Sequence, residues 1–371
     1  MKIAIILGTR PEIIKFSPII RECIRAKQDF FILHTGQHYS YNMDRVFFLQ
    51  LDLPEARYNL DVGSGTHAEQ TAKMLVGIEK ILIKERPDIV LVEGDTNTVL
   101  AGALAAAKLG IRIGHVEAGL RSYDRQMPEE INRVLTDHCS DLLFAPTSVS
   151  KSTLLSEGIP EGRIHITGNT IVDAVYQNID IAKKKMGQNR APDIEPHNYF
   201  LVTLHRQENV DNAQRFKGVL KGMQMVHEEF GLPVIYPIHP RAKKMLKEFE
   251  LKTKGITMIK PLDYLSFLHV ESNAKLVLTD SGGVQEETCI LGVPCVTLRY
   301  NTERPETTDV GSNVLAGTDP NTIIEKVSFM LNKEKHWKNP FGDGRAGARI
   351  VQILNERERR QAFLRRQTIK P

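Results

Sequence analysis

Short apolar runs recur along the chain, and longer segments that place apolar residues on one face separate them. Runs rich in Val, Ile and Leu are typical of strands buried on both faces, whereas the longer segments are typical of amphipathic helices. Their alternation predicts βαβ units and therefore parallel sheets. The predicted strands are residues 2–7, 30–35, 88–93, 112–117, 141–146 and 163–168 in the first half, and residues 199–205, 233–239, 256–260, 275–280 and 293–299 in the second.

A polar segment that contains two prolines, residues 183–198, lies between the halves and indicates a linker. The pattern predicts an α/β fold in which two doubly wound, Rossmann-like parallel-sheet domains, residues 1–182 and 199–344, face each other across a cleft. Sheets of this kind bind ligands at the carboxyl ends of their strands. Polar residues directly after apolar strands are therefore the candidates for function.

The composition, with 371 residues of which 41% are hydrophobic and 25% charged, is that of an ordinary soluble protein of two domains. No apolar run approaches the roughly 18 to 20 residues of a membrane span, and the first residues predict a buried strand rather than a signal peptide. The four cysteines show no C-x-x-C pairing, so we expect no disulfide framework, no zinc site and a reducing, cytoplasmic setting. His34 and His38 have a loose ligand spacing, but Gly36 between them disfavours the helix that would present both, so we expect no metal.

The net charge of +4 is concentrated at the C-terminus, where residues 355–371 contain six basic and two acidic side chains. A basic tail of this kind is typical of a solvated helix face or a frayed end, and a partner-binding arm is the alternative. Binding of single-stranded nucleic acid also uses aromatic stacking platforms, and Phe363 is the one aromatic residue in this tail. We therefore expect neither a nucleic-acid partner nor a membrane partner.

Carboxylates stand at the ends of two predicted strands of the first half, at Asp95 and Glu117. A carboxylate at the end of a strand buried on both faces needs solvent, a partner or a function. Helix capping by Asp95 and an ion pair between Glu117 and Arg121 are the structural alternatives. Acid–base catalysis is the functional interpretation.

A predicted helix that begins at Pro128 carries Glu129, Glu130 and Arg133 within one turn. Spacings of three and four residues place Arg133 on the face of either glutamate, so an exposed ion pair is the structural alternative to a catalytic role. His205 follows an apolar strand of the second half. It can donate a proton to a phosphate, and a histidine with a purely structural partner is the alternative.

The segment TDSGGVQEE, residues 279–287, predicts a turn that opens a helix and leaves backbone N–H groups free for an anion. Arg10 and Lys15, across the turn after the first strand, can reach one common anion. N–H groups and cations would hold a diphosphate, Glu287 the ribose hydroxyls, and other carboxylates the protons of a sugar, so the combination suits a nucleotide sugar. No G-x-G-x-x-G follows a strand, which argues against a nicotinamide cofactor, and there is no Walker loop.

Eight short motifs occur along the chain in an order that is similar to that of a known protein family. They are GTRPEIIK (8–15), GDT (94–96), GHVEAGLR (114–121), PEEINR (128–133), HRQEN (205–209), TDSGGVQEE (279–287), TERPE (302–306) and NPFGDG (339–344). Over nearly its whole length the chain resembles the non-hydrolysing UDP-N-acetylglucosamine 2-epimerases, which are isomerases.

The resemblance implies a GT-B-like fold, with residues 345–371 forming a C-terminal helix that returns toward the first domain. It implies interconversion of UDP-N-acetylglucosamine and UDP-N-acetylmannosamine without a cofactor, in a homodimer that serves polysaccharide biosynthesis. The implied catalytic residues are Asp95, Glu117, Glu129, Arg133 and His205. The implied substrate-binding residues are Arg10, Lys15, Phe267, Ser281, Gly282, Gly283, Glu287 and Arg304. Glu93, Gln207 and Lys73 depart from the pattern of many bacterial members, and Lys73 stands where an arginine contacts a second, regulatory substrate molecule, so such regulation is not expected.

The expected mechanism eliminates UDP to a bound 2-acetamidoglucal and adds it back, because no carbonyl next to carbon 2 would stabilise a carbanion. Proton exchange on two faces of the sugar needs at least two acid–base groups, and the sequence leaves open which carboxylate is the base. A hydrolysing epimerase that releases N-acetylmannosamine, a GT-B glycosyltransferase and a non-catalytic UDP-sugar sensor remain the alternatives.

Overall fold

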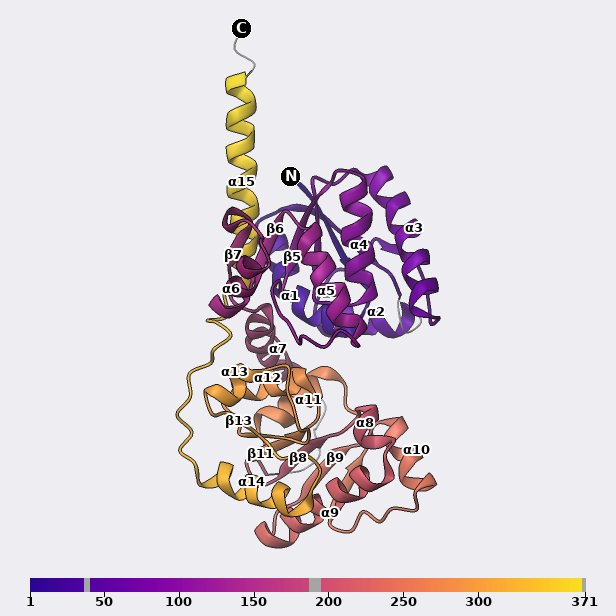
Figure 1. Ribbon diagram of the computed structural model, residues 1–371, viewed down its shortest axis with the longest axis vertical. Helices are drawn as coiled ribbons and strands as arrows, with labels where there is room; N and C mark the ends of the chain where they lie inside the picture. The colour runs from indigo at the N-terminus through magenta and orange to yellow at the C-terminus, as the bar shows by residue number, and fades with distance from the viewer. Residues whose placement is uncertain (37–40, 187–194, 369–371) are drawn as a thin grey trace. The chain divides into compact units, whose positions relative to one another are not determined.

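The computed structural model describes residues 1–36, 41–186 and 195–368, and it divides into two compact units. The first unit contains Met1–Ala174 together with Phe341–Pro371, and the second contains Val175–Pro340 (Figure 1). Each unit is built on its own parallel sheet. The domain limits expected from the sequence stay a prediction.

The first unit holds a seven-stranded parallel sheet in the order β3-β2-β1-β4-β5-β6-β7. The strands are β1 (Lys2–Leu7), β2 (Asp29–His34), β3 (Tyr58–Asn59), β4 (Ile89–Glu93), β5 (Arg112–Val116), β6 (Leu142–Ala145) and β7 (Ile164–Ile166). The chain runs outward from β1 to β3 and then continues on the other side of β1 with β4. This reversal is the switch point of a doubly wound sheet, where loops after neighbouring strands diverge and leave room for a ligand.

The helices of the first unit cover both faces of this sheet (Figure 1). They are α1 (Arg10–Arg25), α2 (Tyr41–Gln50), α3 (His67–Glu85), α4 (Asn97–Lys108), α5 (Pro128–Cys139), α6 (Ser148–Ser156), the start of α7 (Thr170–Met186) and α15 (Ala346–Thr368), with a short 3-10 helix at Glu161–Arg163. The amphipathic faces of α3 and α4 pack on Ile6, Val90 and Val92 of the sheet. Burial of these faces is the main source of their stability.

Helix α15 belongs to the first unit although it lies at the far end of the chain. The backbone N–H groups of Ala346 and Gly347, at its start, donate to the Asp173 carboxylate at 3.1 and 3.0 Å. A side chain at Gly347 would press on Pro18 of α1, so glycine permits the close packing of α1 and α15. The structure describes the backbone of this helix to Thr368, and the side chains of the basic tail beyond Arg359 lie outside the described residues.

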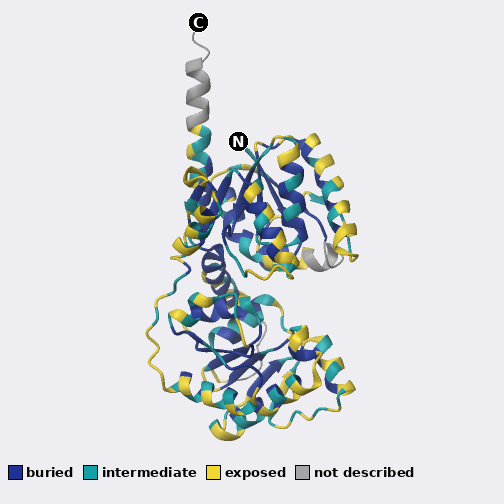
Figure 2. Cartoon of the chain, viewed as in Figure 1, coloured by how far each residue is buried: buried dark blue, intermediate teal, exposed yellow. Residues whose placement is uncertain are grey.

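The second unit repeats the scheme with a six-stranded parallel sheet in the order β10-β9-β8-β11-β12-β13. Its strands are β8 (Phe200–Thr203), β9 (Val234–Pro237), β10 (Ile256–Ile259), β11 (Leu276–Thr279), β12 (Cys295–Thr297) and β13 (Asn313–Leu315). Its helices are α8 (Gln207–Val210), α9 (Ala213–Phe230), α10 (Pro240–Glu248), α11 (Tyr264–Ser272), α12 (Gly282–Leu291), α13 (Pro305–Asp309) and α14 (Pro320–Asn332). Figure 2 shows the strands of both sheets as largely buried, as expected for parallel sheets covered on two faces.

The prediction of two doubly wound parallel sheets is confirmed, and each predicted strand overlaps an observed one. Two short strands, β3 and β13, were not predicted because neither forms an apolar run. Within the described ranges no helix is long and apolar enough to cross a membrane, and no cluster of three metal-ligating side chains occurs. All four cysteines are free, whereas His38 and residues 187–194 of the predicted linker lie outside the described residues.

Candidate active site

Three loops meet at the carboxyl edge of the first sheet, because β1, β4 and β5 are adjacent and parallel. They contain Gly8 and Thr9 after β1, Gly94 to Thr96 after β4, and the segment from Glu117 after β5. A side chain at Gly8 would overlap the hydroxyls of Thr35 and Thr98, so the first loop requires glycine there. The predicted catalytic residues Asp95 and Glu117 therefore lie on neighbouring loops of one edge.

The carboxylate of Glu117 is buried and bonded to the Lys15 ammonium. Lys15 Nζ also lies 3.4 Å from Oε1 of Glu93, the last residue of β4. Glu117 has a φ of +70°, a left-handed conformation that is uncommon for a residue with a side chain and is found preferentially at functional sites. The alternative of an ion pair with Arg121 is wrong, since Arg121 pairs with Asp137 and Glu157 instead.

Glu93 is a buried carboxyl that the sequence did not assign to the site. Burial raises the pKa of Glu93 well above its ordinary value, Lys15 lowers it, and Glu117 raises it further. A raised pKa favours the protonated form of a carboxyl. Lys15 lies between the buried carboxyl of Glu93 and the carboxylate of Glu117.

Glu12, on the first turn of α1, ties the first two loops together. Its Oε2 accepts the N–H groups of Gly8 and Thr9 at 2.5 and 3.0 Å, and its Oε1 accepts the hydroxyl of Thr96. Burial raises the pKa of Glu12 to about 7, although these hydrogen bonds act in the opposite direction. The sequence signal for Glu12 was its place three residues after Thr9, the spacing of a capping box, which carries no information about burial.

Asp95 is bonded to the guanidinium of Arg133 on α5 and is partly exposed. The second nitrogen of that guanidinium donates to Glu130 at 2.9 Å, and Glu130 also accepts the backbone N–H of Ser122 at 2.9 Å. Capping by Asp95 is wrong as an explanation, because the N-cap residue of α4 is Thr96. The structure thus brings the predicted site residues Asp95 and Arg133 into contact.

Glu129 differs from its neighbour Glu130 in its surroundings. Glu130 is buried and holds the loop before α5, whereas Glu129 is exposed and its carboxylate contacts neither Asp95 nor Glu117 in the part of the chain that the structure describes. The structural alternative for the helix, an ion pair of Arg133 with a glutamate, is formed by Glu130. It is buried rather than exposed.

In the second unit, His205 forms an ion-pair contact with a fully buried aspartate. Nδ1 of His205 lies 3.0 Å from Oδ1 of Asp280, and the imidazole is 48% exposed. The same carboxylate accepts the backbone N–H groups of His205 and Arg206 at 3.1 and 3.0 Å. Asp280 therefore fixes both the loop and the ring, and it directs Nε2 of the imidazole toward other partners.

The predicted anion turn starts at Ser281, the N-cap residue of α12. A side chain placed at Gly282 would approach Glu303 no closer than 3.6 Å, and one at Gly283 would meet Ser281 at 4.0 Å. The space beside this turn is thus open, which suits a ligand that approaches the first N–H groups of the helix. Arg304 lies next to α12, with Nε 2.7 Å from Oε1 of Glu286.

Glu287 lies one turn into α12 among buried polar groups of the second unit. Burial raises the pKa of the neighbouring carboxyl Glu271 well above its ordinary value, and the charge of Glu287 raises it further. The hydroxyl of Tyr264 is buried beside Glu287 as well. Glu271 and Glu287 are therefore two neighbouring carboxyl groups in a buried polar environment, and the raised pKa of Glu271 favours its protonated form.

The remaining predicted ligands have apolar surroundings. Phe267, on α11, is partly buried and packs against the apolar cluster that contains Leu201 and Val277. Arg10 opens α1, and its guanidinium lies 5.8 Å from the ring centre of Phe47, a cation–π contact.

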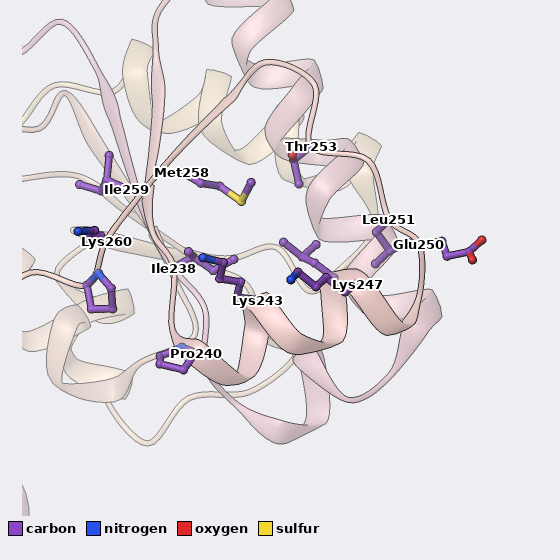
Figure 3. A pocket seen from close by; sticks show the side chains of 12 residues that line it. Ile238, Pro240, Lys243, Lys247, Glu250, Leu251, Thr253, Met258, Ile259 and Lys260 are labelled. Atoms are coloured by element: carbon purple, nitrogen blue, oxygen red, sulfur yellow. The ribbon is translucent and has the colours of Figure 1, made fainter.

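A large cavity lies elsewhere in the second unit, between α10 and the edge strand β10 (Figure 3). Its volume is about 830 Å³, and its walls include Lys243, Lys247 and Lys260 together with Leu246 and Met258. None of the predicted site residues lines it. The catalytic candidates thus belong to the loops at the sheet edges rather than to this cavity.

Two doubly wound parallel sheets define a GT-B-like α/β protein, and predicted site residues follow the carboxyl ends of their strands. A sequence model of the UDP-N-acetylglucosamine 2-epimerase family matches residues 21–355, and the chain belongs to this family. The resemblance inferred from the eight motifs is thereby confirmed.

Individual relatives agree with this assignment. The UDP-N-acetylglucosamine 2-epimerase of Methanocaldococcus jannaschii is 58% identical over 361 residues, 95% of this chain and 99% of the relative. The crystal structure of the M. jannaschii UDP-GlcNAc 2-epimerase in complex with UDP-GlcNAc and UDP is similar with a TM-score of 0.87 at 58% identity, over 96% of this chain and 100% of that chain. The UDP-2,3-diacetamido-2,3-dideoxy-D-glucuronate 2-epimerase of Pseudomonas aeruginosa is 40% identical over 358 residues, 95% of this chain and 99% of the relative.

Proposed function

We propose that this chain interconverts UDP-N-acetylglucosamine and UDP-N-acetylmannosamine without hydrolysis, by elimination and re-addition of UDP. The observation that carries the proposal is the presence of two carboxylates, Asp95 with Arg133 and Glu117 with Lys15, on neighbouring loops of one sheet edge. Two separately held acid–base groups are what proton exchange on two faces of a sugar needs. The names of the M. jannaschii relatives support the choice of substrate.

The reaction starts at carbon 2 of the sugar. A carboxylate takes the proton, the C–H electron pair forms a double bond between carbons 1 and 2, and the bond from carbon 1 to the UDP oxygen breaks with its pair leaving on UDP. In the return step the UDP oxygen adds to carbon 1, and a second acid delivers a proton to the opposite face of carbon 2. Asp95 and Glu117 are the two candidates for the proton transfers, and either one serves as the base.

The cations of the first unit adjust the two carboxylates. Lys15 forms an ion pair with Glu117, and the guanidinium of Arg133 forms one with Asp95, so each carboxylate is held by its own cation. The buried carboxyl of Glu93, whose pKa burial raises, also contacts Lys15. Glu129 remains a predicted member of the catalytic set.

Residues of the second unit hold the leaving group in this proposal. The N–H groups after Ser281 and the guanidinium of Arg304 would bind the diphosphate, and Glu287 would accept the ribose hydroxyls. His205, oriented by Asp280, would donate from Nε2 to the departing phosphate, where charge develops as UDP leaves. A homodimer located in the cytoplasm is part of the proposal, and light scattering of the purified protein tests the dimer.

The test is proton and phosphorus NMR of the purified protein with UDP-N-acetylglucosamine alone. We expect signals of the manno isomer to grow to an equilibrium mixture while the diphosphate signals stay those of a sugar nucleotide. Free UDP together with free N-acetylmannosamine would identify a hydrolysing enzyme, and no change at all would refute the activity. The double variant Asp95→Asn/Glu117→Gln is the inactive control, and Glu79→Gln, at an exposed position of α3, is the control for a surface glutamate.

The name of the P. aeruginosa relative gives a second candidate substrate, a UDP-linked diacetamido uronate. Its extra carboxylate and acetamido group would need their own partners in the sugar pocket. Parallel assays with both sugar nucleotides decide between them by the ratio of their kcat/KM values. The proposal predicts the higher value for UDP-N-acetylglucosamine.

A further inference from the structure

His115, in strand β5, is fully buried, and both of its ring nitrogens meet an acceptor. Nδ1 lies 2.6 Å from Oδ1 of Asp137 on α5, and Nε2 lies 2.8 Å from the carbonyl oxygen of Gly94. Both ring nitrogens are thus placed to make a hydrogen bond, Nδ1 with the Asp137 carboxyl group and Nε2, as the donor, with the Gly94 carbonyl oxygen.

Asp137 is buried with His115 and accepts hydrogen bonds on both oxygens. Its Oδ2 receives the backbone N–H of Gly119 at 3.1 Å and Nη2 of Arg121 at 2.7 Å. Although burial acts to raise it, the contacts with His115 and Arg121 hold the pKa of Asp137 below its ordinary value. Arg121 also pairs with Glu157, so the network extends to a second carboxylate.

The network ends on the two turns that carry the catalytic candidates. Gly94, whose carbonyl His115 holds, immediately precedes Asp95. Gly119, whose N–H Asp137 accepts, comes two residues after Glu117. Both glycines have a φ of +84°, so each turn adopts a conformation that the local chain does not enforce by itself.

We propose that the His115–Asp137 pair is a positioning device that fixes the backbone of the two turns carrying Asp95 and Glu117. The inference rests on the proposed function. His115 acts through Asp95 by holding the carbonyl of the preceding residue, and Asp137 acts through Glu117 by holding the turn that follows it.

Stability alone does not account for the pair. In the sheet, His115 is flanked by Val92 of β4 and Leu143 of β6, both fully buried. An apolar side chain would match these neighbours, and replacement of a buried ion pair by apolar residues of similar volume is often neutral or stabilising. The directional contacts to Gly94 and Gly119 are what an apolar residue would lose.

The test is a double-mutant cycle between His115→Gln and Asp95→Asn. The glutamine side chain stays polar but lacks the two nitrogens at opposite ends of a ring. We expect kcat of His115→Gln to fall about 10- to 100-fold, as for a small misplacement of a reacting group, with KM nearly unchanged. In the Asp95→Asn background, His115→Gln should lower kcat by less than about 3-fold, because the carboxylate that His115 positions is already absent. Equal losses in both backgrounds, or an unchanged kcat in the single variant, would overturn the proposal.

His227→Gln is the matched control, because His227 on α9 is a partly buried histidine whose Nδ1 contacts the Leu232 carbonyl oxygen at 2.9 Å, in the other unit. It should leave kcat unchanged. All variants are assayed well below their unfolding temperatures, so a loss of fold is separated from a loss of kcat.

If His115→Gln does not fold, NMR of the unaltered protein with ¹⁵N-labelled histidine decides instead. An N–H signal at Nε2 of the buried His115 supports the proposal, and its absence overturns it. If the unaltered enzyme does not epimerise the substrate, the proposed function is wrong. If it is active but His115→Gln lowers kcat equally in the unaltered and the Asp95→Asn backgrounds, the proposed function stands and only the positioning role is wrong.

Discussion

Substitution of Glu12 by Gln probes the buried carboxyls at the first sheet edge most sharply. The glutamine side chain can keep the contacts of the loop, since its amide oxygen can accept from Gly8 and Thr9 while its NH₂ group donates to the Thr96 hydroxyl. The variant removes the carboxyl group that binds and releases a proton. Burial raises the pKa of Glu12 from 4.5 to about 7, so the folded protein binds a proton that the unfolded chain releases.

The sign of the pH dependence follows from this difference. A carboxyl whose pKa is raised on folding contributes most to stability below about 4.5, and the contribution is lost as the pH rises through about 7. The rise in the pKa of Glu12 from 4.5 to about 7 corresponds to about 3 kcal/mol of unfolding free energy, at about 1.36 kcal/mol for each pKa unit. Glu12→Gln lacks this loss, so its stability relative to the unaltered protein should increase by up to about 3 kcal/mol between pH 4.5 and 8.

The assay is denaturant unfolding followed by circular dichroism at several pH values between 4.5 and 8. Glu69 gives a matched control, since it occupies the same third position of helix α3 and accepts the N–H of Thr66 at 3.0 Å, but it is exposed. Hydrogen bonds from the Thr66 backbone and side chain lower its pKa below 4.5, so its contribution to stability is lost only at lower pH. The difference between Glu69→Gln and the unaltered protein should therefore change little between pH 4.5 and 8. A difference between Glu12→Gln and the unaltered protein that does not change with pH would refute the buried, proton-binding state of Glu12.

Three further predictions concern catalysis and binding. Asp95→Asn and Glu117→Gln should each lower kcat by at least about 100-fold while leaving UDP affinity, measured by calorimetry, largely intact; near-normal turnover in both would refute their roles. Asp280→Asn should lower kcat by at least about 10-fold, and adding it to His205→Gln should cause little further loss, because Asp280 acts on the ring of His205. Glu287→Gln should weaken UDP binding by about 10-fold, the loss of a hydrogen bond to a charged group, and unchanged affinity would remove Glu287 from the ribose site.

Controls for the Asp280 and Glu287 variants come from the same unit and the same residue types. Asp211→Asn breaks an exposed ion pair with Arg241 and should leave kcat unchanged, since exposed pairs contribute little. Glu325→Gln, at an exposed pair with Lys326, should leave UDP affinity unchanged. A loss in either control as large as in the test variants would indicate a general effect on folding rather than a role in the site.

The regular part of the fold was predictable from the sequence because buried parallel strands are continuous apolar runs. The strand at residues 2–7, for example, was predicted with its observed limits. Strand β3 was missed, since Tyr58–Asn59 is only two residues long and pairs with β2 through tertiary contacts. Strand β13, Asn313–Leu315, starts with a polar residue and gave no apolar run either.

The sequence pointed to individual candidate residues of the site, but it did not show which residues contact one another. The positions of Asp95 and Glu117 after strands predicted that they lie at one sheet edge, and the structure places them on neighbouring loops there, because the carboxyl ends of neighbouring parallel strands lie together. The partner of Glu117 is Lys15, which is 102 residues away in the chain, rather than Arg121, its neighbour in sequence. The order of strands in the sheet brings such distant residues into contact, and this order cannot be read from the spacing of residues in the sequence.

The buried polar groups were harder to predict than the exposed ones. Glu12 matched a local capping pattern and Glu93 marked a departure from related sequences, yet neither signal indicates a raised pKa. That property depends on how much of each carboxyl is covered by side chains from other elements. His115 and Asp137 likewise become a pair only when α5 packs beside β5.

The proposed elimination and re-addition is tested most directly by epimerisation in deuterated water. UDP-N-acetylglucosamine is incubated with the purified enzyme, and proton NMR follows the signal of the hydrogen on carbon 2 of the product. The account predicts UDP-N-acetylmannosamine that carries deuterium on carbon 2, because the proton removed by one carboxylate exchanges with solvent before another acid returns it. A manno product that retains its original hydrogen on carbon 2 would contradict the account.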